Sequence, residues 1–143
     1  MSGENSDIKA LNEACKKIKA ENKLSEELKI KLEKKFPKIF NEALQLVYGK
    51  RVKKYVFKPS YRVLWAVSGR KDEYQVIPEA SFCSCNDFYF RVVGGKKKVC
   101  YHLIAQKIAE ALRIYEEKEL SNSDYERIAE KWRGKIKKTA LHL

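Results

Sequence analysis

Cys83-Ser84-Cys85 and, after fourteen intervening residues, Cys100-Tyr101-His102 are the two runs of sequence that decide the fold. They contain three of the chain's four cysteines and one of its two histidines. Three thiolates and one imidazole form the set of four S and N ligands that a closed tetrahedral zinc site requires. The sequence therefore predicts one structural Zn²⁺ ion bound by Cys83, Cys85, Cys100 and His102.

The local sequence around these residues is compatible with a shared site. Residues 81–85 are typical of the end of a strand, where side chains at positions i and i+2 point to the same face, so that Cys83 and Cys85 can reach one ion. Cys100 and His102 open a strongly helical segment. We expect Cys100 just before the first helical turn and His102 within it, where the helix dipole favours the negative charge of the thiolates.

The cysteines allow two other interpretations. A disulfide between Cys83 and Cys85 would be strained, because bridge geometry requires the two Cβ vectors to face each other. The N-terminal residues do not resemble a signal peptide, so an oxidising compartment is not implied and we expect a cytoplasmic protein, or a nuclear one in a eukaryote. Buried free cysteines remain an alternative, although they would not explain the neighbouring His102.

The length and composition indicate one folded domain. A chain of 143 residues can bury its own core. No stretch approaches the roughly 18 apolar residues of a membrane-spanning helix, so no membrane association is expected. We predict an α+β fold across residues 1–143, with a helical region over 1–49, a sheet with the zinc finger over 50–118, and a C-terminal helix over 119–143.

Three amphipathic helices are predicted at the N-terminus. The first covers residues 7–20 and places Cys15 on its apolar stripe, as a core residue rather than a ligand. Ser25 is a candidate N-cap for a second helix that ends near Lys35. A third helix runs from Pro37 to about Tyr48.

The remaining pattern predicts a small sheet and two C-terminal helices. Residues 53–58, 61–67 and 74–77 are strand-like and are separated by turn residues, which favours an antiparallel meander with one face on the helices. Residues 88–93 form a further candidate strand. A helix follows the ligands to about Lys118, and Ser123 with Glu126 forms a capping box for a last helix. The apolar stripe of that helix is Tyr125, Ile128, Trp132 and Ile136.

The formal net charge of +12 is concentrated in two blocks. Residues 43–71 carry eight basic residues and residues 88–109 carry five, and neither block contains an acid. Charge of one sign gathered in this way indicates a polyanionic partner such as nucleic acid, whereas an ordinary solvated surface interleaves the signs. The alternative is a highly charged surface with no partner.

Two groups of residues are candidates for DNA binding. One is a strand face with Lys53, Lys54, Lys58 and Arg62, where Tyr55, Tyr61 or Trp65 could stack on bases. For Trp65, packing in the core is the competing interpretation, since it alternates with Val63 and Val67. The other group lies in the segment between the ligand pairs and comprises Arg91, Lys96, Lys97 and Lys98. No base-reading set is apparent, so we expect little sequence preference.

The pattern C-x-C-x(n)-C-x-H, with the small residue Ala105 three positions after His102, resembles the SWIM zinc finger. With the aromatic run Phe88-Tyr89-Phe90 and the basic segment, residues 40–130 resemble the stand-alone SWIM subunit of Shu-type recombination complexes, in an archaeal-like form. That family typically has Pro after the second cysteine, where this chain has Asn86. The resemblance implies a non-enzymatic protein that partners a RecA-family (RadA) recombinase paralogue and assists homologous recombination on DNA, mainly single-stranded.

No catalytic constellation is evident in the sequence, so an enzyme is not expected. Gly94-Gly95-Lys96 has neither the spacing nor the hydroxyl of a phosphate-binding loop, and all four predicted zinc positions are protein ligands, which leaves none for water. The alternative to direct DNA binding is an adaptor, in which the partner holds the DNA and an apolar helix stripe holds the partner. A homodimer that forms through such a stripe is a further alternative.

Overall fold

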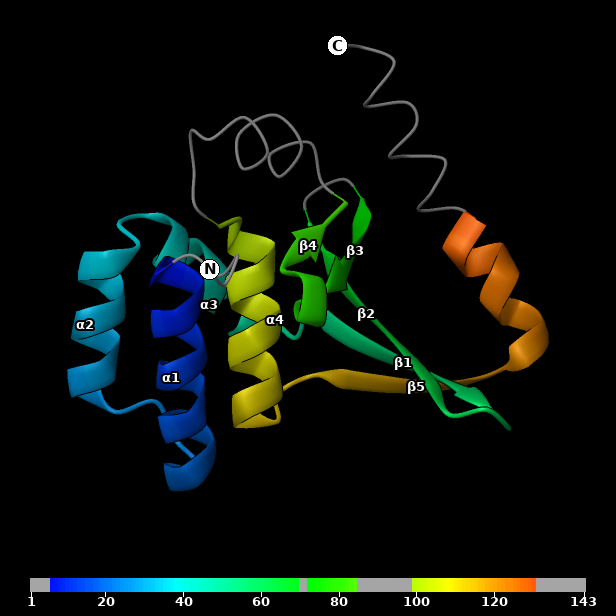
Figure 1. Ribbon diagram of the computed structural model, residues 1–143, viewed down its shortest axis with the longest axis horizontal. Coiled ribbons are helices and arrows are strands. Elements are labelled where there is room, and N and C mark those ends of the chain that lie inside the picture. The colour runs from blue at the N-terminus through cyan, green and yellow to red at the C-terminus, as the bar shows by residue number, and fades with distance from the viewer. Residues whose placement is uncertain (1–5, 70–71, 85–98, 131–143) are drawn as a thin grey trace, which may run out of the picture.

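A computed structural model of the chain describes residues 6–69, 72–84 and 99–130, and shows a layer of helices against one end of a five-stranded sheet (Figure 1). The elements, in chain order, are α1 (Ser6–Glu21), α2 (Glu26–Lys35), α3 (Ile39–Tyr48), β1 (Val52–Lys58), β2 (Arg62–Ser68), β3 (Glu73–Ile77), the 3₁₀ turn η1 (Pro78–Ala80), β4 (Phe82–Cys83), α4 (Tyr101–Leu112) and β5 (Glu116–Ser121). A further helix occupies residues 122–130. Within the described ranges, no helix is both long and apolar enough to cross a membrane.

The helical layer forms where the apolar spacing predicts it. In α1, Ile8, Leu11 and Ile18 recur at helical spacing and are buried against the other helices. The predicted cap of α2 is confirmed, because the Ser25 hydroxyl accepts a hydrogen bond from Leu28 N at 3.2 Å. This layer gives α4, which carries two of the predicted ligands, a packed surface on α1 and α3.

The sheet has the strand order β4-β3-β2-β1-β5. The first three strands form the predicted antiparallel meander, which the short β4 extends. β5 then pairs with β1 in parallel, so the sheet is mixed. The α+β prediction is confirmed. The candidate strand over 88–93 lies outside the described residues.

β5 corrects one sequence prediction. The helix expected to reach Lys118 ends at Leu112, because Arg113 takes a left-handed backbone conformation (φ 61°) and closes the last turn. Residues 116–121 then extend along β1, where Glu117 lies 3.8 Å from Lys54 and Glu119 lies 3.0 Å from Lys58. These charged residues match the lysines of a strand that precedes them by more than fifty residues.

Each face of the sheet carries a buried apolar cluster, which corrects a second prediction. Val52, Trp65 and Val67 face the helical layer and belong to the main core. The opposite face was expected to be rich in basic and aromatic side chains, but it holds a second apolar cluster. The members of that cluster are Tyr55, Phe57, Leu64 and Ala66, with Leu120, Tyr125 and Ile128 packed against them.

The second cluster also decides the role of the C-terminal stripe. Tyr125 packs edge-on against Phe57, with ring centroids 5.1 Å apart, so this part of the stripe belongs to the protein's own core. Trp132 and Ile136 lie outside the described residues.

The C-terminal helix begins at residue 122, two residues before the start that the Ser123/Glu126 pattern predicts. The contact that resembles a capping box is made by Asp124, whose carboxylate accepts a hydrogen bond from Ser121 N at 3.3 Å.

Candidate metal centre

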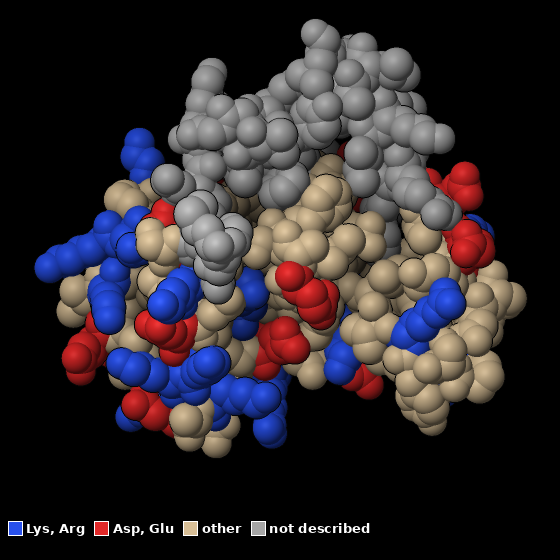
Figure 2. Space-filling model, viewed as in Figure 1, with Lys and Arg blue, Asp and Glu red and all other residues tan. Residues whose placement is uncertain are grey.

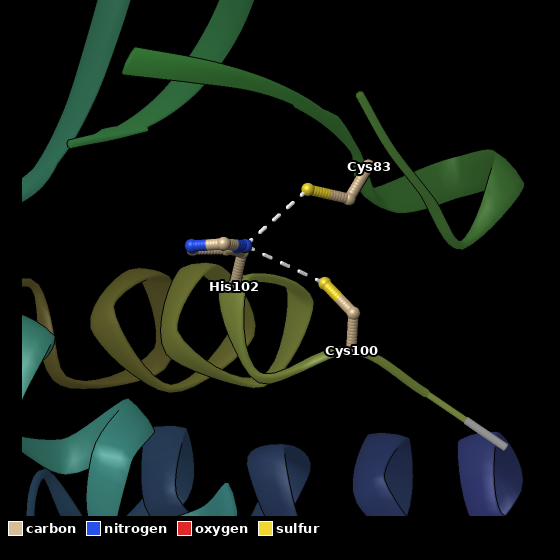
Figure 3. Close-up of side chains that lie close together, drawn as sticks. All are labelled: Cys83, Cys100 and His102. Carbon is tan, nitrogen blue, oxygen red and sulfur yellow. Dashed lines mark hydrogen bonds between the residues drawn. The ribbon is translucent and has the colours of Figure 1, made fainter. Parts of the chain in front are cut away.

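Cys83 is held in place by the sheet. It lies at the end of β4, where it pairs with Val76 of β3. The next residue fixes the chain from both sides: Ser84 N donates to Gln75 O at 2.9 Å, and Gln75 N donates to the Ser84 hydroxyl at 2.9 Å. These bonds direct the Cys83 thiol toward α4 (Figure 3).

Cys100 and His102 are held by the start of α4, as the sequence predicts. Cys100 is the N-cap residue, with an extended backbone, and its carbonyl accepts from Leu103 N at 3.1 Å. His102 lies in the first turn. The positive end of the helix dipole is therefore next to the Cys100 sulfur and favours its thiolate form.

The three side chains converge on one point from two separate elements (Figure 3). His102 Nδ1 lies 3.7 Å from Cys83 Sγ and 3.8 Å from Cys100 Sγ, and all three ligand atoms are within 4.8 Å of one another. In a tetrahedral zinc site with Zn–S near 2.3 Å and Zn–N near 2.0–2.1 Å, the edge between S and N is about 3.6 Å. The observed separations therefore fit two sulfurs and one nitrogen around a single ion.

The burial of the cluster also fits a metal ion. Cys83 and Cys100 are each 1% exposed and His102 is 3% exposed. Two thiolates at this depth carry a large desolvation penalty unless a cation compensates them. A divalent ion held by these atoms provides that compensation, whereas neutral thiols beside the imidazole would form only weak S–H hydrogen bonds.

The ring of His102 is oriented by two tyrosines and a glycine. Tyr101 and Tyr74 pack on it, with ring centroids 4.2 Å and 4.9 Å away. A Cβ at Gly69 would lie 3.0 Å from Tyr74 Cε2, so a larger residue would displace the tyrosine that packs on the His102 ring. This packing turns Nδ1 toward the sulfurs. Nε2 is buried and has no hydrogen-bond partner among the residues that the structure describes.

The structure thus brings together three of the four predicted ligands, and Cys85 lies outside the described residues.

Cys15 is separate from this cluster, as predicted, and packs at the edge of the main core. Burial raises the pKa of the Cys15 thiol to about 12. Cys15 is therefore a protonated thiol at neutral pH. The packing of Gly69, Tyr74 and Tyr101 on His102 was not predicted, and no sequence motif marks it.

The four strand residues predicted to bind DNA are already engaged within the fold. Lys53 pairs with Glu73 at 3.5 Å, in addition to the Lys54–Glu117 and Lys58–Glu119 pairs. The Arg62 guanidinium lies 4.7 Å from the centroid of the Tyr125 ring. Lys53 and Lys54 are consecutive in β1 and so point to opposite faces of the sheet, and the carboxylates of β5 and β3 compensate much of the charge of the strand lysines. Arg91, Lys96, Lys97 and Lys98 lie outside the described residues.

The three aromatic residues considered for base stacking separate into two groups. Tyr55 and Trp65 are buried, and the Tyr55 hydroxyl donates to Glu73 at 2.9 Å. For Trp65, the core interpretation is confirmed. Tyr61 is 66% exposed, and the Lys58 ammonium lies 5.5 Å from its ring centroid. Of the three, only Tyr61 presents a ring to solvent.

Comparison with known proteins gives one informative match. A protein of Dictyostelium discoideum described as a zinc finger SWIM domain-containing protein 7 homolog is 33% identical over 107 residues, which cover 73% of this chain and 69% of the relative. No protein-family model matches the chain, and no solved structure matches it.

Proposed function

Because this chain belongs to the family of SWIM domain-containing zinc finger proteins, we propose that it binds one structural Zn²⁺ and serves as a non-enzymatic accessory subunit in homologous recombination. The observation that carries the proposal is the buried Cys83/Cys100/His102 cluster, whose spacing along the chain is the SWIM pattern. Cys85 would complete the four ligands. With four protein ligands the ion supplies a cross-link between β4 and α4, and it has no position for water or substrate.

The proposed partners are a RecA-family recombinase paralogue, of the RadA type in an archaeal host, and single-stranded DNA. Support for the paralogue comes from the resemblance of residues 40–130 to the SWIM subunit of Shu-type complexes. Support for DNA comes from the net charge of +12 and from Lys96-Lys97-Lys98, a basic run between the ligand pairs. Without a base-reading element, binding would be independent of sequence and strongly dependent on salt.

One structural observation favours a second candidate function. Lys53, Lys54 and Lys58 are paired with carboxylates, which lowers the charge that the strand face can offer to phosphates. In the adaptor alternative, the zinc site stabilises a surface for the protein partner, and the partner holds the DNA. Tyr61, in the turn before β2, and Val63 of β2 are exposed and are the apolar side chains available there for such a contact.

One binding experiment separates the two functions. The full chain is titrated against fluorescent oligothymidylate over a salt series, alone and with the recombinase paralogue that co-purifies from the native host. Steep salt dependence of the chain alone, reduced when Lys96, Lys97 and Lys98 are changed to Ala, supports direct binding. Binding only in the presence of the paralogue supports the adaptor. If neither the chain nor its complex binds DNA and no paralogue co-purifies, the recombination role is wrong.

A further inference from the structure

The helical layer contains a basic groove away from the zinc cluster and the strand face. The groove lies between α1 and α4, which run side by side (Figure 1), and has a volume of about 500 Å³. On the face shown in Figure 2, Lys and Arg side chains gather over this helical half of the molecule. The charged residues that line the groove are Lys9, Glu13, Lys16, Lys19, Lys107 and Glu110.

The lysines of the groove lie on both of its walls, which are α1 and α4. Lys9, Lys16 and Lys19 are separated by seven and three residues, so they follow one flank of α1 over about 15 Å. Lys107 faces them from α4. A row of cations along one wall, with another cation opposite, matches an extended chain of phosphates better than a single anion.

These lysines differ from the strand lysines in how they are engaged. None of the four forms a salt bridge with a carboxylate of the described residues, whereas Lys53, Lys54 and Lys58 each do. Of the two acids in the groove, Glu110 accepts a hydrogen bond from the buried Gln106 amide at 2.9 Å. Four lysines against two glutamates leave the groove with a net charge of +2.

The composition of the groove favours nucleic acid over protein. Protein interfaces depend on buried aromatic or large aliphatic anchors. Among the described residues, the exposed large apolar side chains are Ile30, Tyr48, Tyr61 and Val63, and none of them lines the groove. The groove also lacks an aromatic ring for base stacking, so its contacts would be to the sugar–phosphate backbone.

We infer that the α1/α4 groove, defined by Lys9, Lys16, Lys19 and Lys107, is the surface on the described part of the chain that contacts the nucleic-acid backbone. This inference rests on the proposed DNA binding and names a surface for it. It moves the contact from the predicted strand face, where the lysines are paired, to the helical layer.

The test compares two variants with the same change in net charge. The groove variant carries Lys9→Gln, Lys16→Gln, Lys19→Gln and Lys107→Gln. The control variant carries four changes at exposed lysines outside the groove and without a salt bridge in the described residues: Lys23→Gln, Lys31→Gln, Lys34→Gln and Lys50→Gln. Each full-length protein is titrated against oligothymidylate between about 50 and 200 mM salt, and thermal melts check that the fold is kept.

Each single-strand phosphate that a lysine neutralises contributes about 0.7 to the slope of log K against log salt. If all four lysines contact phosphates, the slope of the groove variant falls by up to about 2.8, and its affinity at 100 mM salt falls at least about tenfold. The control variant keeps the slope of the unmodified protein. Equal losses in both variants, or an unchanged groove variant, overturn the inference and leave the proposed DNA binding intact. Absence of binding by the unmodified protein, with and without its paralogue, overturns the DNA binding itself.

Discussion

His102 Nδ1 lies 3.7 Å from Cys83 Sγ, although nineteen residues separate the two side chains and they belong to different elements. The contact joins the end of β4 to the first turn of α4. Since Cys100 Sγ lies 3.8 Å from the same nitrogen, the three atoms outline one face of a zinc tetrahedron. The site is therefore made only when the sheet and the helical layer meet.

The first prediction concerns a ligand thiol. Changing Cys83→Ser should lower the free energy of unfolding by more than about 3 kcal/mol, because structural zinc sites contribute on the order of 10–16 kcal/mol to folding. The measurement is urea unfolding of the zinc-loaded protein, followed by circular dichroism. Cys15→Ser is the matched control, since Cys15 lies outside the cluster, and it should cost no more than about 2 kcal/mol. Equal losses in the two variants would contradict a metal role for Cys83.

The second prediction concerns the packing behind His102. Gly69→Ala places a Cβ 3.0 Å from Tyr74 Cε2, so Tyr74 should move and its packing on the His102 ring should change. Zinc affinity, measured by competition with a chromogenic chelator, should fall about 10–100-fold, as it does when the groups that orient a ligand are disturbed. Ser68→Ala, one residue earlier, should leave the affinity unchanged. An unaltered affinity in Gly69→Ala would show that the ring is not fixed by this contact.

The third prediction concerns alkaline pH. Burial, reinforced by the hydrogen bond to Glu73, raises the pKa of Tyr55 above its ordinary value near 10. The folded state therefore favours the neutral phenol. The stabilisation from Tyr55 is fully present below pH 10 and is lost as the pH rises above 10 toward the folded pKa.

Comparison with Tyr55→Phe isolates this effect from the other tyrosines and the lysines. The unfolding free energy of each protein is measured by urea titration from pH 8 to pH 11. The unmodified protein should be the more stable at pH 8, and this advantage should begin to shrink between pH 10 and pH 11. Parallel curves would show that Tyr55 does not titrate differently in the folded and unfolded states.

The fourth prediction concerns the pairing of β5 with β1. The Lys54 ammonium lies 3.8 Å from Glu117 and also 5.7 Å from the ring centroid of Trp65. A double-mutant cycle with Lys54→Gln and Glu117→Gln should give a coupling energy of about 0.2–1 kcal/mol, reduced in high salt, because the pair is partly exposed. Lys54→Gln alone should cost more than Glu117→Gln alone, since it also removes the contact with Trp65. A coupling near zero would remove the ion pair as a factor in holding β5.

Local sequence patterns predicted the helices, the meander and the ligands, because each depends on spacing within one element. The N-cap at Ser25 and the position of Cys100 just before α4 are examples. β5 was missed because its partner, β1, lies far away in the sequence, and Glu-Glu-Lys-Glu has low intrinsic strand preference. The second core was missed for the same reason, since Tyr55 and Phe57 are buried only when residues 122–130 fold over them.

The measurement that tests the central claim most directly is X-ray absorption at the zinc edge on the full chain, purified without chelators, together with its metal content. The account predicts one equivalent of zinc with three sulfur neighbours at about 2.3 Å and one nitrogen at about 2.0–2.1 Å. Less than half an equivalent of metal, or a shell without sulfur, would contradict the assignment of Cys83, Cys85, Cys100 and His102 as ligands of a structural zinc ion.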